Sequence, residues 1–253
     1  MLEVRDVRAI TPKMVRITIG GDELAGFVSA AHDDHVKLFF PPPGQDKPVL
    51  PTSGPNGPVY PDGAARPAAR DYTPRRYDAA AGTLAIDFVL HGDGPAATWA
   101  ARARPGDFLG VGGPRGSFIV PDDFDWYLLA GDETALPAIG RRLEELPAGA
   151  RAIVVVEVAD AGEQQRLDTN ARLETVWLDR GGVEPGAQPL LFDAIASLAL
   201  PSGEGYAWVA AEAATAKAVR RHLVEERGLP KDRVKAAAYW KRGEVAVHET
   251  YND

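Results

Sequence analysis

A cation, an aromatic ring and a hydroxyl stand within four consecutive residues, Arg70 to Thr73. If this stretch is extended, alternation places Arg70 and Tyr72 on one face of the strand and Thr73 on the other. A flat anionic ligand needs such a set, because the ring can stack on it, the guanidinium can bind its phosphate and the hydroxyl can meet a polar ring edge. The alternative is a half-exposed strand whose arginines are solvated, since short motifs often match by chance.

A second stretch that suits an anion leads from a strand into a helix. The apolar run that ends at His91 continues as Gly-Asp-Gly-Pro and then as small residues. Pro95 suits the first turn of a helix, where its missing N–H is no loss. The free amides of Ala96, Ala97 and Thr98 would then form an anion site, which the helix dipole strengthens. The alternative is a Gly-Pro turn that needs no ligand.

Composition limits the classes of protein that this chain can be. Its 253 residues are 45% hydrophobic and 25% charged, as in soluble globular proteins. No stretch approaches the roughly 20 apolar residues of a membrane span, and the charged amino terminus predicts no signal peptide. The chain has no cysteine, which excludes disulfides, thiol catalysis and cysteine-ligated iron–sulfur clusters, so redox chemistry would need a bound organic cofactor. The net charge of -8 argues against nucleic acid as a partner.

The first half of the chain consists of short β-rich segments separated by glycine-rich turns. This pattern predicts an antiparallel β-barrel. The expected strands are Val4–Ile10, Met14–Ile19, His35–Phe40, Arg70–Tyr77, Thr83–His91 and an extended run over Asp107–Val120. We expect the Pro/Gly-rich stretch between Pro41 and Arg70 to be a surface loop beside the ligand site.

In the second half, apolar runs alternate with helical patterns. The alternation predicts a doubly wound parallel α/β domain whose ligands bind at the carboxyl ends of the strands. The expected strands are Trp126–Ala130, Ala152–Val158, Thr175–Leu178, Tyr206–Ala210 and Val234–Tyr239, and the expected helices are Ala135–Leu146, Leu190–Leu198 and Ala213–Arg227. The predicted domains are 1–122 and 123–253.

The first strand of the second half runs into Gly131, a polar turn and a helix. A dinucleotide would place its phosphates at such a turn. However, the turn lacks the G-x-G-x-x-G pattern and carries two acids, Asp132 and Glu133, where the pyrophosphate would lie. The alternative is that Asp132 or Thr134 simply caps the helix.

These stretches together resemble the siderophore-interacting proteins, flavin-dependent ferric-siderophore reductases related to ferredoxin reductases. The resemblance rests on five blocks that fall in order over nearly the whole chain: residues 70–73, 87–96, 131–137, 208–213 and 239–243. It implies a two-domain, ferredoxin-reductase-like fold, with FAD on the barrel and NADPH or NADH on the α/β domain. It also implies release of iron from imported siderophores in the cytoplasm.

The resemblance also implies cofactor contacts in each half. By this resemblance, Tyr72 stacks on the isoalloxazine of FAD, Thr73 forms a hydrogen bond with the edge of that ring system, and Arg70 holds a phosphate. The positions that match the cofactor motifs are Arg70, Asp71, Tyr72, Thr73, Asp87, Phe88, Val89, His91, Gly94, Pro95, Ala96, Ala97, Thr98, Gly131, Asp132, Glu133, Thr134, Ala211, Glu212 and Trp240. Two positions depart from the family pattern, since Ala97 stands where serine is common and Ala211 where glycine is usual. His91 can instead be a strand-end histidine satisfied by the backbone.

Four basic residues are candidates for binding an anionic ferric siderophore, namely Lys37, Arg115, Lys241 and Arg242. The alternative is that they are solvated or loosely paired, as exposed cations commonly are. Tyr239 and Trp240 can cover the flavin or belong to the core.

The electron count agrees with a flavoenzyme. Nicotinamide gives up two electrons together whereas ferric iron accepts one, and a flavin mediates between the two. The flavin performs the chemistry, so we expect no catalytic side chain and no resident metal. Ferredoxin is an alternative electron donor, and we expect a monomer without membrane contact. Two other functions remain open at this point, a flavin reductase or electron-transfer module with a protein acceptor and a siderophore-binding protein that does not catalyse reduction. The choice between NADH and NADPH is also open, with Arg166, Arg172 and Arg180 as loose candidates for a 2′-phosphate.

Overall fold

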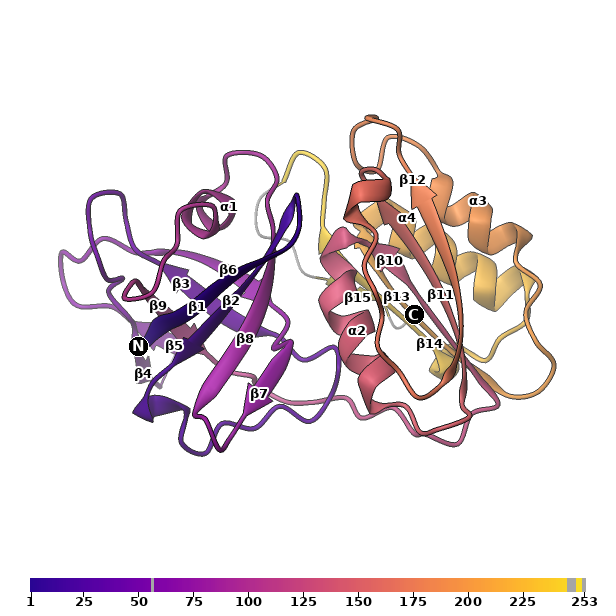
Figure 1. Cartoon of the computed structure of the whole chain (residues 1–253), viewed down its shortest axis with the longest axis horizontal. Coiled ribbons are helices and arrows are strands. Elements are labelled where there is room, and N and C mark those ends of the chain that lie inside the picture. Colours follow the sequence, from indigo (N-terminus) through magenta and orange to yellow (C-terminus); the bar gives the residue numbers. More distant parts are fainter. Residues whose placement is uncertain (56, 245–248, 252–253) are drawn as a thin grey trace. The chain divides into compact units, whose positions relative to one another are not determined.

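The structure is a computed structural model that describes residues 1–55, 57–244 and 249–251. The chain divides into two compact units, Met1–Ile119 and Val120–Asp253 (Figure 1). The predicted domains were 1–122 and 123–253. Each unit is described by itself below.

Unit 1 is built on a seven-stranded sheet in the order β6-β3-β9-β1-β2-β8-β7. Its strands are β1 Leu2–Thr11, β2 Met14–Gly20, β3 Val36–Phe40, β6 Ala68–Tyr72, β7 Arg76–Asp78, β8 Thr83–Val89 and β9 Phe108–Gly112. Every neighbouring pair is antiparallel. The predicted antiparallel architecture is therefore confirmed as a curled sheet, whose two edge strands are β6 and β7.

Three parts of unit 1 differ from the sequence prediction. The stretch 70–77 is not one strand, because it breaks between β6 and β7 around Pro74, which has no N–H to donate to a sheet. The run 107–120 is a strand only over β9, since the chain turns at Gly113 with a φ of 96°. The predicted surface loop contains a short hairpin of β4 Thr52–Gly54 and β5 Gly57–Val59.

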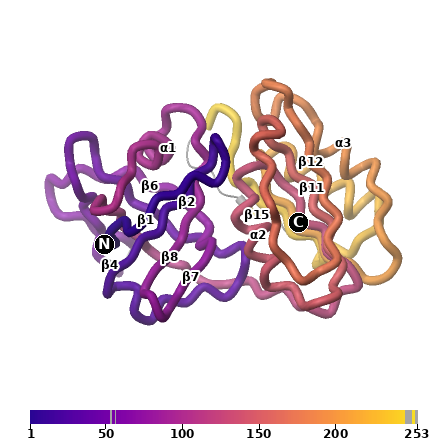
Figure 2. The backbone as a smooth tube through the Cα atoms, in the orientation of Figure 1, coloured from indigo at the N-terminus to yellow at the C-terminus, as the bar shows by residue number. Residues whose placement is uncertain are grey.

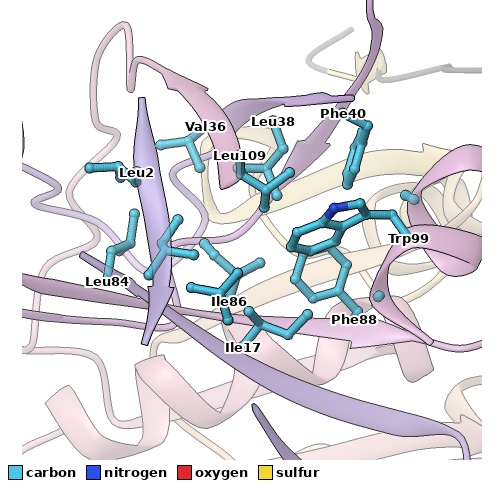
Figure 3. Close-up of a cluster of buried hydrophobic side chains, with 14 of the residues drawn as sticks. Leu2, Ile17, Val36, Leu38, Phe40, Leu84, Ile86, Phe88, Trp99 and Leu109 are labelled. Atoms are coloured by element: carbon cyan, nitrogen blue, oxygen red, sulfur yellow. The ribbon is translucent and has the colours of Figure 1, made fainter. Parts of the chain in front are cut away.

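Aromatic side chains fill one end of the core of unit 1. Trp99 comes from helix α1 (Pro95–Ala100) and lies against Phe40 of β3 and Phe88 of β8, with ring centroids 5.7 and 5.9 Å apart (Figure 3). All three side chains are buried. Burial of such large apolar groups stabilises each by about 1.5–3 kcal/mol relative to exposure. Helix α1 is therefore held by its tryptophan to the two strands β3 and β8.

Unit 2 is built on a six-stranded sheet in the order β12-β11-β10-β13-β14-β15. Its strands are β10 Trp126–Asp132, β11 Arg151–Val158, β12 Arg172–Asp179, β13 Gly205–Glu212, β14 Val234–Trp240 and β15 Glu249–Tyr251. All pairs are parallel except that of β14 with β15, so the sheet is mixed. The chain winds outward from β10 to β12 and then returns to β13, which makes the boundary of β10 and β13 the topological switch point.

Helices cover both faces of this sheet, as a doubly wound domain requires. Leu191 and Ile195 of α3 (Leu190–Ser197) join Val219 of α4 (Ala213–Arg221) in one core cluster with alternate residues of β10 and β13. Helix α2 (Leu136–Glu145) lies on the other face (Figures 1 and 2). Shorter turns of helix are η1 Asp22–Leu24, η2 Glu133–Ala135, η3 Ala161–Glu163, η5 Lys231–Arg233 and the π-helical His222–Glu226 that extends α4. Among the described residues, no helix has the length and apolar character that crossing a membrane would require.

Candidate functional site: an aromatic strand edge and a switch point

The alternation predicted for the Arg70–Thr73 stretch is fixed by the pairing of β6 with β3. Tyr72 lies opposite Val36 and Arg70 opposite Leu38, and both partners are fully buried. Asp71 lies opposite Lys37, and these two side chains form an ion pair of 2.7 Å. Because paired residues point to the same face of a sheet, Tyr72 and Arg70 share one face and the Lys37–Asp71 pair occupies the other.

Tyr72 is supported from within the core. Its ring centroid lies 4.5 Å from that of Phe88 at an interplanar angle of 40°, and 6.5 Å from that of Phe40. The side chain is partly buried. Burial raises the pKa of the Tyr72 phenol, against the opposing positive charge of Arg70, so the ring stays neutral at physiological pH. The packing holds a neutral aromatic surface at the edge of the sheet.

Arg70 has no carboxylate partner among the described residues. Its Nη1 donates to the carbonyl oxygen of Ala69 over 2.8 Å, which leaves the other guanidinium donors for a ligand. Thr73 follows β6 and is buried. The structure thus brings together the ring, the cation and the hydroxyl that the sequence predicts at this edge.

Asp87 has a structural partner that the sequence analysis missed. Both oxygens of this buried carboxylate accept from Arg16, over 2.6 and 2.7 Å, and Arg75 lies 3.9 Å away. Arg16 faces Asp87 directly in the pairing of β2 with β8. A cross-strand partner could have been found by aligning the two predicted strands. The carboxylate of Asp87 therefore holds β8 in place, directly before Phe88.

The start of α1 provides fewer free amides than predicted. Thr98 donates its amide to Gly94 over 2.9 Å and its hydroxyl to the carbonyl oxygen of Asp93 over 3.1 Å. The prediction of a free Thr98 amide is wrong, because this amide makes the first bond of the helix. Ala96 and Ala97 stand before that bond, so their amides have no acceptor within the helix. A Cβ added at Gly94 would meet no other atom within 4 Å, and His91 lies exposed between β8 and α1.

At the switch point of unit 2, Asp132 caps the turn that follows β10. Its Oδ1 accepts from the amide and hydroxyl of Thr134 over 2.9 and 2.5 Å, and its Oδ2 accepts from the Trp240 indole over 2.8 Å. Burial raises the pKa of this carboxyl, while the hydrogen bonds from Thr134 and Trp240 oppose the rise. The capping alternative is therefore correct for Asp132.

Gly131 is required by packing. A Cβ there would lie 2.2 Å from the oxygen of Ala210 and 2.4 Å from the Cβ of Ala135. Such distances are impossible without backbone movement. The glycine therefore allows η2 to approach β13 closely, whether or not a ligand is present.

Glu212, at the end of β13, caps helix α4 as Asp132 caps η2. Its Oε2 accepts from the amides of Ala214 and Thr215 over 2.7 and 3.2 Å, and its Oε1 accepts from the amide of Arg242 over 3.5 Å. Both helices that start at the switch point are therefore capped by carboxylates of this chain. These acceptors suit the hydroxyl and amide donors of a ligand better than its phosphates.

A buried charge cluster lies at the same edge of the sheet. Arg180, directly after β12, bonds both oxygens of Glu133, and its Nη1 also lies 3.4 Å from Glu157. All three side chains are buried. Burial raises the pKa of the Glu157 carboxyl, against the opposing charge of Arg180. The cluster ties the ends of β10, β11 and β12 together.

The four basic siderophore candidates differ in their surroundings. Lys37 is paired with Asp71, and Lys241 is paired with Glu244. Arg115 and Arg242 are exposed. Their role in substrate binding stays a prediction. Among the described residues, no group of three or more acidic or histidine side chains is placed to hold a metal ion.

Unit 1 carries an aromatic ring and a cation on its edge strand β6, and unit 2 is a doubly wound domain with polar side chains at its switch point. Together these features are those of a two-domain protein that binds a flavin and a dinucleotide. Comparisons with known proteins agree with this class. Residues 3–118 match the siderophore-interacting FAD-binding domain, and residues 124–243 match the siderophore-interacting protein model. The chain belongs to the siderophore-interacting protein family, as its sequence motifs predict.

Relatives of known name and structure support the assignment over nearly the full length. The NADPH-dependent ferric-chelate reductase of Escherichia coli is 39% identical over 242 residues, which cover 94% of this chain and 91% of the relative. The ferric vibriobactin reductase of Vibrio cholerae is 36% identical over 245 residues, which cover 95% of this chain and 89% of the relative. A crystal structure of a siderophore utilization protein from T. fusca is 46% identical, with a TM-score of 0.89 and coverage of 97% and 94%.

The raised pKa values of Asp132 and Glu157 predict how stability depends on pH. A carboxyl whose pKa is raised on folding contributes stability below its usual pKa of about 4, and this contribution is lost as the pH rises through the raised value. We expect Asp132→Asn to lose less stability than the wild type as the pH rises above about 4, by about 1.4 kcal/mol for each pKa unit of elevation. Urea unfolding at a series of pH values measures this slope.

The matched control is Asp168→Asn, which removes an exposed carboxylate from the same unit. Its slope should follow that of the wild type. A slope for Asp132→Asn that also equals the wild-type slope would contradict the pKa assignment.

Proposed function

We propose that this protein is a flavin-dependent ferric-siderophore reductase, which passes electrons from NADH or NADPH through FAD to Fe(III) and so releases Fe(II). The observation that carries the proposal is the edge strand β6, where Tyr72 and Arg70 share one face above the buried ring of Phe88. This strand lies in the unit that matches an FAD-binding domain.

The residues of unit 1 fit FAD. Tyr72 offers a supported neutral ring on which an isoalloxazine can stack, and aromatic pairs of this kind contribute about 0.5–1.5 kcal/mol beyond their burial. Thr73 would bond a polar edge of the ring system. The guanidinium of Arg70 and the amides of Ala96 and Ala97 would bind the diphosphate, as charge-assisted donors do. When bound, FAD takes two electrons as a hydride and delivers them one at a time.

The switch point of unit 2 fits the sugar and amide portions of a nicotinamide dinucleotide. Asp132 and Glu212 present carboxylate oxygens beside the half-buried indole of Trp240. The carboxylates accept from hydroxyl or carboxamide donors, while the indole supplies an apolar wall. At this edge Gly131 allows η2 to lie close to β13, since a Cβ there would collide with Ala210 and Ala135.

The reaction balances with one dinucleotide for two ferric complexes. A hydride leaves the nicotinamide with two electrons, each of two Fe(III) ions takes one, and a proton is released. Siderophore oxygen ligands hold Fe(II) far less strongly than Fe(III), so reduction opens the chelate. Basic side chains such as Lys37, Arg115, Lys241 and Arg242 would attract the anionic complex. We further propose that the reaction takes place in the cytoplasm, with a monomeric enzyme and with ferredoxin as an alternative donor.

The proposal predicts two separate electron-transfer steps. In the absence of oxygen, NADH or NADPH should bleach the yellow absorbance of the FAD-loaded protein, because a hydride reduces the flavin. Addition of a ferric siderophore should restore the colour and yield a ferrous ion that a ferrous-specific chelator detects. Bleaching without ferrous ion would favour a protein acceptor, and iron-complex binding without bleaching by either dinucleotide or reduced ferredoxin would favour a carrier. Each result would contradict the proposal.

Arg70→Ala should yield protein that is largely free of flavin, because the diphosphate loses its charged partner. A charge-assisted contact of this kind is worth about 1.5–3 kcal/mol, or a loss of roughly tenfold to a hundredfold in affinity. The flavin-to-protein absorbance ratio of the purified protein measures the effect. Arg8→Ala, an exposed arginine on β1 of the same unit, is the control and should stay yellow. An equally yellow Arg70→Ala preparation would contradict the assignment.

Replacement of Lys37 and Lys241 together by alanine should slow ferric-siderophore reduction at subsaturating substrate by about tenfold, because two attractive charges are lost. FAD content and bleaching by the dinucleotide should not change. The control replaces Lys47 and Lys231 by alanine, which removes the same charge from the same two units. Equal rates for both double variants would reject Lys37 and Lys241 as the docking residues.

A further inference from the structure

Lys37 has a different neighbour on each side across the sheet of unit 1. On the β6 side it lies opposite Asp71, and on the β9 side it lies opposite Gly112. Residues that lie opposite one another point to the same face of a sheet. The side chain of Lys37 is therefore flanked by a carboxylate on one side and by bare backbone on the other.

The ion pair of Lys37 with Asp71 is partly open to solvent. Its two charged atoms, Nζ of Lys37 and Oδ1 of Asp71, lie 2.7 Å apart, and the side chains are 44% and 24% exposed. Among the described residues, neither side chain has a second ion-pair partner. Ion pairs at such positions are individually weak, so an anion from solution can compete with Asp71 for the ammonium.

The β9 side of Lys37 leaves room for such an anion. Among the described residues, a Cβ added at Gly112 would meet no atom closer than the ring of Phe39, at 3.4 Å. The next row of the same face is covered, since a Cβ at Gly110 would lie 2.2 Å from the side chain of Leu50. The uncovered part of this face therefore begins beside Lys37.

A second cation stands at the same end of the β3–β9 pair. The chain turns at Gly113, with a φ of 96°, and continues into Arg115, which is exposed. Ser117 then donates its hydroxyl to the buried carboxylate of Asp34 over 2.7 Å, which ties this turn to the segment before β3. An anion that reaches the ammonium of Lys37 from the β9 side thus approaches a turn that is anchored and carries a cation.

The charge of a ferric siderophore depends on its ligand groups. Three catecholates around Fe(III) form a trianion, whereas three hydroxamates form an uncharged complex. Because Coulomb attraction grows with the charge of the ligand, the loss of one attractive cation weakens binding of the trianion most. A group that opposes one substrate and not another is a determinant of specificity.

We propose that Asp71 sets the charge preference of the ferric-complex site. It competes with anionic complexes for the ammonium of Lys37, and so shifts the preference from trianionic, catecholate-type complexes toward uncharged, hydroxamate-type ones. The inference rests on the proposed function, because it takes Lys37 to belong to the surface that attracts the ferric complex. The family resemblance counts Asp71 among the cofactor positions, but its side chain lies on the opposite face of β6 from Arg70 and Tyr72.

Equilibrium binding to the FAD-loaded protein, with no electron donor present, tests the inference without the iron reaction. The two probes are ferric enterobactin, a tris-catecholate trianion, and ferrichrome, an uncharged tris-hydroxamate complex, each titrated by calorimetry. Asp71→Asn keeps the size of the side chain and removes its charge. We expect this variant to bind the trianion about three- to fivefold more tightly than the wild type and the uncharged complex equally well. The gain should shrink as the salt concentration rises.

Two controls accompany this variant. Glu3→Gln removes the same charge from another partly exposed ion pair of unit 1, in which Glu3 is 35% and Arg5 is 50% exposed. It should leave both affinities unchanged. In a Lys37→Ala background, Asp71→Asn should change the affinity for the trianion by less than about 1.5-fold, because the charge for which Asp71 competes is absent.

Each outcome decides the inference. A gain for the trianion alone that disappears in the Lys37→Ala background supports it. No gain for the trianion, or the same gain for both complexes, overturns it. So does an equal gain from Glu3→Gln or a gain that persists without Lys37, because general charge would then explain the effect.

The same titrations separate the inference from the function on which it rests. If the wild type binds neither complex, the docking role of this surface fails, and the inference fails with it. If the expected binding pattern holds but neither NADH nor NADPH yields a ferrous ion, the reductase proposal fails while the role of Asp71 stands.

Discussion

The packing of one partly exposed ring against a buried aromatic cluster is the interaction on which the proposed flavin site depends. Tyr72 lies on an edge strand, where a side chain would ordinarily be free to change rotamer. Phe88 lies directly against it, and Phe40 and Trp99 hold Phe88 in turn. The ring of Tyr72 is thereby ordered before any ligand arrives, so stacking costs little conformational entropy. The ion pair of Arg16 with Asp87 fixes β8, which carries Phe88.

Unit 2 differs from unit 1, because carboxylates of the chain itself accept hydrogen bonds from the amides at its helix starts. A glycine-rich dinucleotide fold leaves helix amides free for a pyrophosphate. Here Asp132 and Glu212 accept from those amides, and each also contacts the segment around the end of β14. The end of β14 is thus held to both sides of the switch point. A ligand at this edge meets acceptors and an indole, so recognition depends on hydroxyls, amides and ring surface.

The sequence predicted the features that local pattern controls. The continuous apolar run of β11 could hardly be anything but a buried strand, and the alternation of Arg70, Tyr72 and Thr73 followed from extended geometry alone. Features that depend on distant partners were not predictable. Arg180 looked like a free cation, because its partners Glu133 and Glu157 are separated from it by tens of residues and meet it only at the sheet edge. The three-residue strand β15 has no apolar pattern by which it could be recognised.

An acidic protein can bind several anions only if its cations are left unpaired where they are needed. Several arginines here are neutralised by a nearby carboxylate, as Arg16, Arg142 and Arg180 are. Arg70 differs from these three, because its hydrogen-bond partner is the backbone carbonyl of Ala69 and no carboxylate among the described residues compensates its charge. Because Arg70 is only partly buried, water can solvate its guanidinium until a ligand supplies an anion.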